Sequence, residues 1–276
     1  MSQLLEGKTA LILGVANRWS LAYAIARAFI RENAEVILTY QGDRQKQTVE
    51  ELAAELKARQ VLPCDVTQDA QVDALADMLR KDLKGQGRVL NAVVHSIAFA
   101  NREDLSRPFV ETSRSGFALA QDVSAYSLVA VARATAPLMA PADHNGNSGA
   151  HQNGGSIMTL TYLGSTRVVE NYNVMGVAKA ALEASVRYLA ADLGPCNIRV
   201  NAISAGAVKT TSARGIRDLS KMIEGGAKMA PLRRNTDPAE VADTAVFLAS
   251  DLGRGVTGNV IYVDAGMQIM GFALKE

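Results

Sequence analysis

The sequence is poor in the residue types that build metal sites and disulfide frameworks. Its 276 residues include only two cysteines, Cys64 and Cys196, and three histidines, His95, His144 and His151. Neither set has the spacing of metal ligands, and two distant cysteines in such a chain are typical of reduced, buried thiols. We therefore expect no metal site and no disulfide.

An excess of one charge and long apolar runs are also lacking. The chain has 29 Lys and Arg against 28 Asp and Glu, and no basic block stands out, which argues against nucleic-acid binding. No segment approaches the roughly 20 continuous apolar residues of a membrane span. The stretch from Met1 to Lys8 lacks the apolar core of a signal peptide. We expect a cytoplasmic protein that binds neither nucleic acid nor membrane.

What the chain does contain is a regular alternation of short apolar runs and amphipathic helical patterns. Apolar residues make up 48% and charged residues 21%, as in ordinary globular proteins. The predicted strands are Thr9–Leu13, Glu35–Thr39, Gln60–Pro63, Val89–His95, Ser156–Leu160, Ile198–Ile203 and Val260–Val263. This alternation predicts an α/β Rossmann fold in which residues 1–276 form one domain, a doubly wound seven-stranded parallel sheet flanked by helices.

The helices between these strands are predicted from apolar residues at helical spacing. They are Leu21–Ile30, Asp43–Ala58, Asp69–Leu83, Thr112–Leu119, Val123–Met139 and Asn171–Leu193. A further helix begins at Asp237, where Asp, Pro and Glu occupy the N-cap, N1 and N3 positions. The segment Ala142–Gly154, rich in Gly, Asn and His, predicts an exposed loop.

The turn after the first strand is a weak nucleotide-binding signal. A dinucleotide site needs backbone N–H groups and a helix N-terminus close to the pyrophosphate. Gly14 is the only glycine of the usual G-x-G-x-x-G pattern, although Ala16 and Ala22 are small. Ser20 is placed to cap the next helix and to donate to a phosphate.

The ends of the second and third strands bear on cofactor choice. An acidic residue that selects an unphosphorylated ribose is expected after the second strand, and Gln41 stands there instead. Arg44 and Lys46 lie close enough in sequence to receive a 2′-phosphate, so the residues alone leave NADH and NADPH open. Asp65 is placed either to meet an adenine amino group or to form a turn.

The strongest local signal is Tyr172 followed seven residues later by Lys179. Seven residues of α-helix turn through about 700°, nearly two full turns, so the two side chains would share one face. Tyr and Lys in such positions are more often surface residues than catalysts. The small residues Gly176 and Ala178 between them favour close packing of this helix.

Longer segments resemble a known family. The segments TYLGSTRVVENYNVMGVAK, IRVNAISAG and GVTGNVIYVDAG resemble short-chain dehydrogenase/reductases, as do LTYQGD and VHSIAFA. More narrowly, they resemble the bacterial NADH-type enoyl-acyl-carrier-protein reductases. The resemblance runs from about Leu5 to Met270. Ala98 and Ala207 depart from it, standing where Gly and Pro are usual.

This resemblance implies catalytic roles for Tyr162, Tyr172 and Lys179. Tyr172 would donate to an enolate oxygen, Lys179 would bind the nicotinamide ribose, and Tyr162 would line the pocket and help in proton delivery. Most short-chain dehydrogenases place Tyr four residues before Lys, but position 175 here is Met. The wider spacing moves the donor about 4.5 Å along the helix, away from the carbon that receives hydride. The alternatives are a carbonyl or alcohol dehydrogenase and a non-catalytic NAD-binding regulator.

The resemblance also implies the remaining contacts. NADH is favoured over NADPH, and the substrate is an enoyl thioester on acyl carrier protein that would contact Ala100, Tyr162 and Tyr172. A homotetramer is implied, and the pattern of residues 210–229 predicts a small helical lid over the substrate. Cofactor contacts are implied for Gly14, Ser20, Leu21, Gln41, Asp65, Val66, Ile97, Lys179, Val208, Lys209, Thr210, Thr211 and Ser212.

Overall fold

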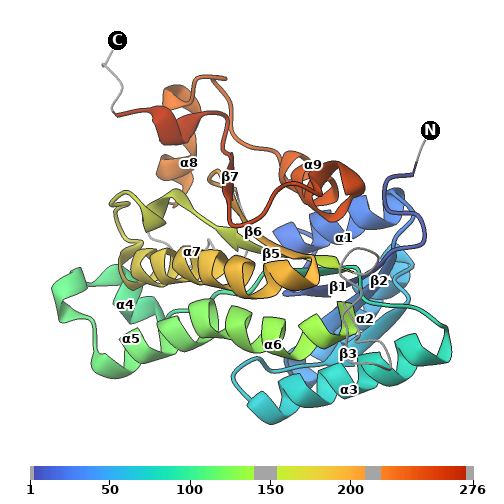
Figure 1. Cartoon of the computed structure of the whole chain (residues 1–276). Coiled ribbons are helices and arrows are strands. Elements are labelled where there is room, and N and C mark those ends of the chain that lie inside the picture. Colours follow the sequence, from blue (N-terminus) through green and yellow to red (C-terminus); the bar gives the residue numbers. More distant parts are fainter. Residues whose placement is uncertain (1–2, 140–153, 209–218, 272–276) are drawn as a thin grey trace.

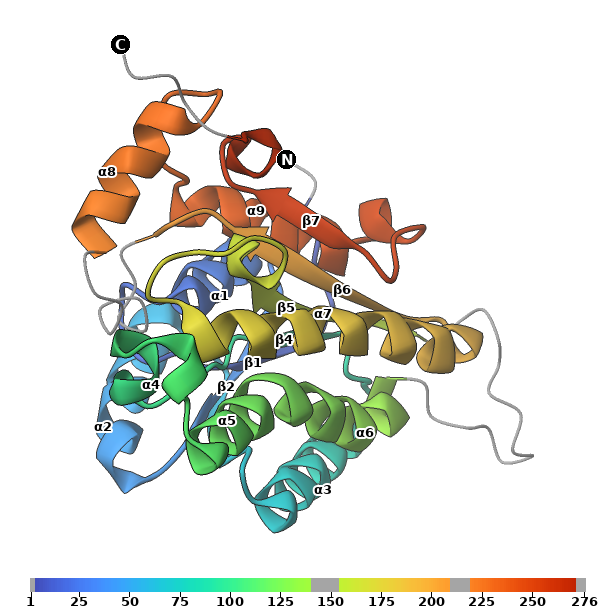
Figure 2. The ribbon, with the colours of Figure 1, turned by 90° about the vertical axis from the view of Figure 1, so that its left-hand side faces the viewer.

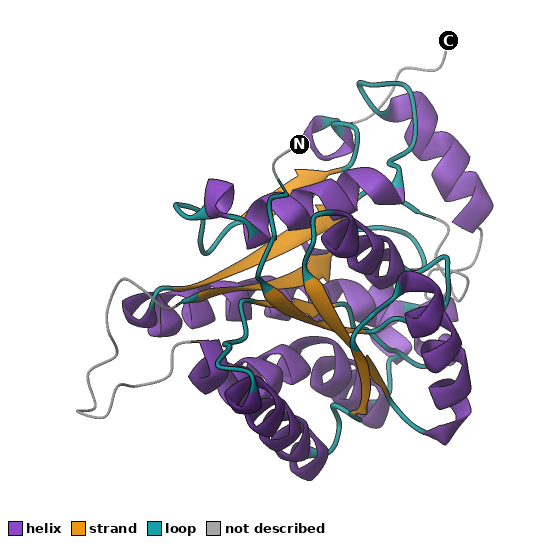
Figure 3. Cartoon of the chain, turned by 90° about the vertical axis from the view of Figure 1, so that its right-hand side faces the viewer, coloured by secondary structure: helices purple, strands orange, loops and turns teal. Residues whose placement is uncertain are grey.

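One parallel sheet forms the centre of the molecule. The computed structural model describes residues 3–139, 154–208 and 219–271, and seven strands in these ranges pair in the order β3-β2-β1-β4-β5-β6-β7. Figure 3 shows this twisted sheet with helices on both sides. The strands are β1 (Thr9–Leu13), β2 (Glu35–Tyr40), β3 (Gln60–Pro63), β4 (Ala92–His95), β5 (Gly155–Thr161), β6 (Ile198–Ala205) and β7 (Val260–Val263).

The helices cover both faces of this sheet (Figure 1). They are α1 (Leu21–Arg31), α2 (Asp43–Leu56), α3 (Asp69–Gly85), α4 (Arg102–Ser106), α5 (Arg114–Gln121), α6 (Ser127–Met139), α7 (Asn173–Leu193), α8 (Leu219–Met229) and α9 (Pro238–Ala249). One apolar core joins the sheet to α1, α2 and α9, and a second joins it to α3, α6 and α7. Burying both faces explains why the strands are continuous apolar runs. The predicted α/β Rossmann fold is confirmed.

Most predicted boundaries are confirmed to within a few residues, and three elements differ from the prediction. The predicted strand from Val89 begins only at Ala92, because the backbone N–H of Leu90 donates to Leu138 of α6 instead of a strand. The short helix α4 was missed. The predicted helix Val123–Met139 is divided, since residues Asp122–Tyr126 form a π-helix before α6.

The cap at Asp237 is confirmed as a full capping box. Its carboxylate accepts from Ala239 N at 2.8 Å, and Glu240 accepts from Asp237 N at 2.9 Å. Residues 142–153 of the loop predicted over Ala142–Gly154, and the first half of the predicted lid, lie outside the described residues. The second half of the predicted lid segment forms α8, which lies toward the same side of the molecule as α4 and the start of α7 (Figure 2).

The two cysteines differ in their surroundings. Both are free thiols; Cys64 is buried, as predicted, whereas Cys196 is half-buried, so the prediction of two buried thiols is wrong for Cys196. Burial, together with the neighbouring charge of Asp65, raises the pKa of Cys64 to about 12. Among the described residues, no group of three potential ligands is placed to hold a metal, and no helix has the length and apolarity to cross a membrane.

Candidate active site

The carboxyl ends of β1 and β4 meet where the strand order changes direction. β1 pairs with β2 on one side and β4 on the other, which makes this the switch point where α/β sheets bind ligands. Gly14, directly after β1, has a φ of +95°. A Cβ at this position would collide with the backbone oxygen of Ser96, directly after β4. Glycine is therefore required here both for its conformation and for the close approach of two chain segments.

The turn after Gly14 leads into α1 as the sequence predicts. Ser20 is the N-cap, and its Oγ accepts from Tyr23 N at 3.2 Å. The same hydroxyl donates to Asn17 O at 2.8 Å, so donation to a phosphate would require it to leave that partner. The first turn of α1, which starts at Leu21, contains no acidic residue. The positive end of the helix is thus left without a neutralising carboxylate of its own.

Gln41 and Asp65 are brought together from the ends of β2 and β3. Gln41 Nε2 donates to Asp65 Oδ2 at 3.3 Å, while Asp65 Oδ1 accepts from both the N–H and the hydroxyl of Thr67. Burial raises the pKa of Asp65, but the hydrogen bonds from Thr67 and Gln41 outweigh that effect and lower it. The turn role considered for Asp65 is confirmed, and the carboxylate places a negative charge beside Gln41.

The other predicted contact residues vary in exposure. Val66 is buried, Ile97 packs on the core beneath α3 and α6, and Val208 is half-buried. Ala98 and Ala100 pack against the apolar cluster that contains Tyr172, so the methyl group of Ala98 lies beside the predicted pocket. Lys209, Thr210, Thr211 and Ser212 lie outside the described residues.

Tyr172 lies just before α7 and not within it, which corrects the predicted helix start at Asn171. The residues on either side, Asn171 and Asn173, have φ values of 61° and 41°. Asn is one of the few non-glycine residues that adopts this left-handed region. Asn173 Nδ2 also donates to Arg107 O at 2.7 Å, which ties this bend to the segment after α4. The same-face argument from an ideal helix therefore does not describe Tyr172.

Tyr172 is nevertheless fixed next to Tyr162. Their ring centroids are 5.0 Å apart with an interplanar angle of 66°, an edge-to-face arrangement. Tyr172 is 8% exposed, and Met175 packs in the same cluster. Burial, then the proximity of Tyr162 and Glu183, raises the pKa of Tyr172 well above its usual value. Its phenol therefore stays protonated and able to donate across the physiological pH range.

Gly164 is the residue against which the Tyr172 ring is packed. A Cβ on Gly164 would collide with Cδ1 of that ring and approach Cε1 to 2.7 Å. We expect Gly164→Ala to displace the ring and lower kcat about tenfold or more, because misplaced catalytic groups lose rate steeply. Steady-state kinetics would measure this, with Gly85→Ala as control because a Cβ there meets nothing within 4 Å. Equal rates in both variants would show that the ring position does not matter.

Lys179 is buried on α7 and reaches the end of β5. It is 5% exposed, and its Nζ donates to Leu160 O at 2.7 Å. Burial lowers the pKa of Lys179 to about 8, against the opposing influence of Glu183. An ammonium group has three donors, so this bond leaves two for a ligand such as a ribose diol.

His95 lies beneath this site at the end of β4 and was not predicted to have a role. Its Nδ1 is 2.9 Å from Thr159 Oγ1 and its Nε2 is 2.8 Å from Ser127 Oγ. Burial, together with the charge of Lys179, lowers its pKa to about 3, so the ring is neutral. Fully bonded and buried, His95 serves as a structural support for the neighbouring strand β5.

Another residue missed by sequence reasoning is Ser124, in the π-helix before α6. Its Oγ accepts from Phe99 N at 3.0 Å and donates to Phe99 O at 3.1 Å. The extra residue of a π-turn changes which side chains face inward, and such turns occur often at functional sites. Ser124 thereby holds the segment that contains Ile97 and Ala100. Helical periodicity carries no signal for this bulge.

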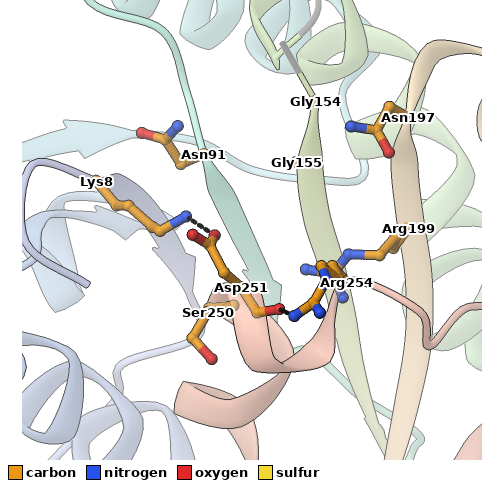
Figure 4. Close-up of a pocket in the computed structure, with 10 residues that line it drawn as sticks. Lys8, Asn91, Gly154, Gly155, Asn197, Arg199, Ser250, Asp251 and Arg254 are labelled. Carbon is orange, nitrogen blue, oxygen red and sulfur yellow. Dashed lines mark hydrogen bonds and ion pairs between the residues drawn. The ribbon is translucent and has the colours of Figure 1, made fainter. Parts of the chain in front are cut away.

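A pocket of about 350 Å³ lies at the opposite edge of the sheet, where the strands begin (Figure 4). Its cations are bound to protein groups: Lys8 Nζ donates to Asp251 Oδ1 at 2.8 Å, and Arg199 donates to Leu248 O at 2.6 Å. These contacts fasten the end of α9 to the sheet, which explains the pocket structurally. Its lining residues are Lys8, Asn91, Gly154, Gly155, Asn197, Arg199, Ala249, Ser250, Asp251 and Arg254.

Comparison with known proteins decides the family. Residues 14–268 match the family model described as enoyl-(acyl carrier protein) reductase. The chain belongs to this family. It is 51% identical over 271 residues to the NADH-type enoyl-acyl-carrier-protein reductase of Bacillus cereus, covering 98% of this chain and all of that protein.

Two further relatives show the range of the family. The Staphylococcus aureus enzyme, named as NADPH-dependent, is 46% identical over 264 residues, covering 95% of this chain and 97% of that protein. The crystal structure of the Anaplasma phagocytophilum reductase in complex with NAD superposes with a TM-score of 0.91 at 42% identity. That match covers 100% of this chain and 99% of the other. Enoyl-acyl-carrier-protein reductases thus share this fold over the whole chain, and the predicted family is confirmed.

Proposed function

We propose that this chain reduces the C2–C3 double bond of trans-2-enoyl thioesters carried on acyl carrier protein, the last step of type II fatty-acid elongation. NADH supplies the hydride when bound. The observation that carries the proposal is a buried Tyr172 and a buried Lys179 with Met175 at the position where carbonyl reductases have their tyrosine. This spacing disfavours the carbonyl dehydrogenase alternative, and the presence of both residues disfavours a non-catalytic regulator.

The residues present fit a dinucleotide. The close approach of Gly14 to Ser96 and the acid-free start of α1 leave backbone N–H groups for a pyrophosphate. The two remaining donors of Lys179 suit ribose hydroxyls. The carboxylate of Asp65 beside Gln41 repels a 2′-phosphate, which supports NADH over NADPH.

In the reaction, Tyr172 holds a hydrogen bond to the thioester oxygen, where negative charge develops as C3 is reduced. Lys179 orients the nicotinamide ribose and adds a positive charge beside this donor. Tyr162 packs edge-to-face on the Tyr172 ring, lines the pocket and helps in proton delivery. We further propose that α8, the second half of the predicted lid, covers the acyl chain.

We also propose the homotetramer that the family resemblance implies. Large apolar side chains are exposed on α5, the π-helix and α7, at Phe117, Tyr126, Val177 and Tyr188. Exposed apolar groups on adjacent elements are suited to burial between subunits. Analytical ultracentrifugation tests this proposal, because a homotetramer sediments with the mass of four chains. The cytoplasmic location stays a prediction from the sequence.

The reaction is tested by following NADH absorbance with crotonyl-CoA as substrate and a simple ketone as control. We expect oxidation with the enoyl thioester alone, and weaker activity with NADPH because of Asp65. Oxidation with only the ketone would contradict the proposal, and a preference for NADPH would contradict the cofactor assignment.

A further inference from the structure

Two consecutive residues at the end of β5 are each hydrogen-bonded to α7. Lys179 Nζ donates to Leu160 O at 2.7 Å, and Thr161 Oγ1 donates to Glu183 Oε1 at 2.6 Å. Lys179 and Glu183 are four residues apart, one helical turn, so they lie side by side on the helix. The two bonds fasten the carboxyl end of β5 to the part of α7 that carries Lys179.

The hydrogen bond between Thr161 and Glu183 is buried in the protein. Thr161 is 5% exposed and Glu183 is 6% exposed. Glutamate is rarely buried without a partner, and an apolar residue often serves stability equally well at such a position. Glu183 is bonded to Thr161 and exerts an electrostatic influence on both Lys179 and Tyr172. The groups around Glu183 are therefore those of the candidate site, and packing alone does not explain why this side chain is buried.

The residue after Thr161 is Tyr162, whose ring packs on Tyr172. The Thr161 bond thus fixes the backbone one residue before the pocket tyrosine. Glu183 also counteracts the effect of burial on Lys179, because its proximity raises the pKa of that lysine. The Glu183 carboxylate is thus connected to Tyr162, through Thr161 on β5, and to Lys179 on α7.

We propose that Thr161 and Glu183 form a positioning pair that fastens the carboxyl end of β5 to α7 and thereby sets the placement of Tyr162 and Lys179. In this proposal the pair acts through Tyr162 and Lys179 and does not itself contact substrate or cofactor. This inference rests on the roles proposed above for Tyr162, Tyr172 and Lys179.

Other titratable groups lie near Lys179 and Glu183 on neighbouring elements. His95 on β4 stays neutral because its pKa is about 3, and Tyr172 stays protonated because its pKa is raised. The pKa of Tyr162 is also raised, by burial and then by Asp264. We therefore expect an alkaline titration of this site to report Lys179, whose pKa burial lowers to about 8.

Four variants separate positioning from packing. Thr161→Val keeps the shape and removes the donor, whereas Thr161→Ser keeps the donor. Glu183→Gln retains an oxygen acceptor and removes the charge. The matched control is Thr135→Val, a 1% exposed threonine on α6 whose hydroxyl donates to Val131 O. For each we would measure kcat, KM, thermal stability and the pH profile of kcat/KM for NADH.

We expect Thr161→Val to lower kcat about tenfold, since it leaves a buried carboxylate without its donor, and Thr161→Ser to restore the wild-type value. Glu183→Gln should move the alkaline fall of the NADH profile about one pH unit lower. If Thr161→Val loses only as much stability as Thr135→Val and keeps its kcat, the threonine is merely structural. An unmoved profile in Glu183→Gln would overturn the role of the charge.

Direct NADH titration across pH, without an enoyl substrate, tests Glu183 independently of the proposed reaction. The Thr161→Ser and Thr161→Val pair differs by one hydroxyl and decides the positioning role even if Glu183 variants do not fold. Failure of the wild type to reduce enoyl thioesters would contradict the proposed function, whereas the titration would still support or contradict the pair.

Discussion

Replacing Tyr172 by Phe should lower kcat about 100- to 1,000-fold while leaving the affinity for NADH nearly unchanged. The substitution keeps the ring that packs against Tyr162 and Gly164, so the local structure should persist. What is lost is the phenol that donates to the developing enolate, and removal of one such donor typically costs this much in kcat. Stopped-flow turnover with a saturating enoyl thioester, together with NADH titration, measures the two quantities separately.

Tyr162→Phe is the matched control for that experiment. It also removes one phenol from the same ring pair, but from the residue proposed to line the pocket. We expect a decrease in kcat of less than about tenfold, since in the proposed reaction Tyr172, and not Tyr162, bonds the oxygen on which charge develops. If the Tyr162 variant were the more severely affected, the two roles would have to be exchanged.

Replacing Lys179 by Met should lower kcat/KM for NADH about 100-fold, because two charge-assisted hydrogen bonds to the cofactor are lost. Met fills a similar volume without a charge. Wild-type kcat/KM should fall above about pH 8, where Lys179 loses its proton. The Met variant should lack this dependence, and a fall at the same pH in the variant would assign the titration to another group.

The same substitution should not destabilise the fold near neutral pH. The pKa of Lys179 is about 8 in the folded protein, below the roughly 10.4 of an unfolded chain. Between these values the unfolded state binds more protons, so wild-type stability rises with pH across that window and carries a burial penalty below it. We expect Lys179→Met to equal or exceed the wild type in melting temperature at pH 7. A lower melting temperature would indicate that the buried charge is stabilising.

Local sequence patterns predicted the strands and helices well, because the interactions that form these elements join residues close in sequence. The continuous apolar strands, the Ser20 cap and the Asp237 capping box each depend on residues within a few positions of one another. The exact strand ends were less predictable. β4 begins later than the apolar run because a contact with Leu138, far along the chain, competes for its backbone.

At the candidate site, local patterns indicated the residues but not how the fold places them. Tyr172 and Lys179 could be selected from spacing and family resemblance, but the bend made by Asn171 and Asn173 could not, since it depends on backbone angles outside the helical range. The bond from Thr161 to Glu183 joins residues 22 positions apart on different elements. Their types are ordinary for a strand and a helix, so only the folded structure reveals the pair.

The two thiols differ in burial, which allows a dye to be attached selectively to one of them. Cys64 is buried with a pKa of about 12, so a maleimide dye at neutral pH should react at the half-buried Cys196. Cys196 follows the far end of α7, whose 21 residues separate it from Tyr172 by about 30 Å. A fluorophore there stands at a known distance from the chemistry. It can follow docking of acyl carrier protein by energy transfer without disturbing the reacting groups.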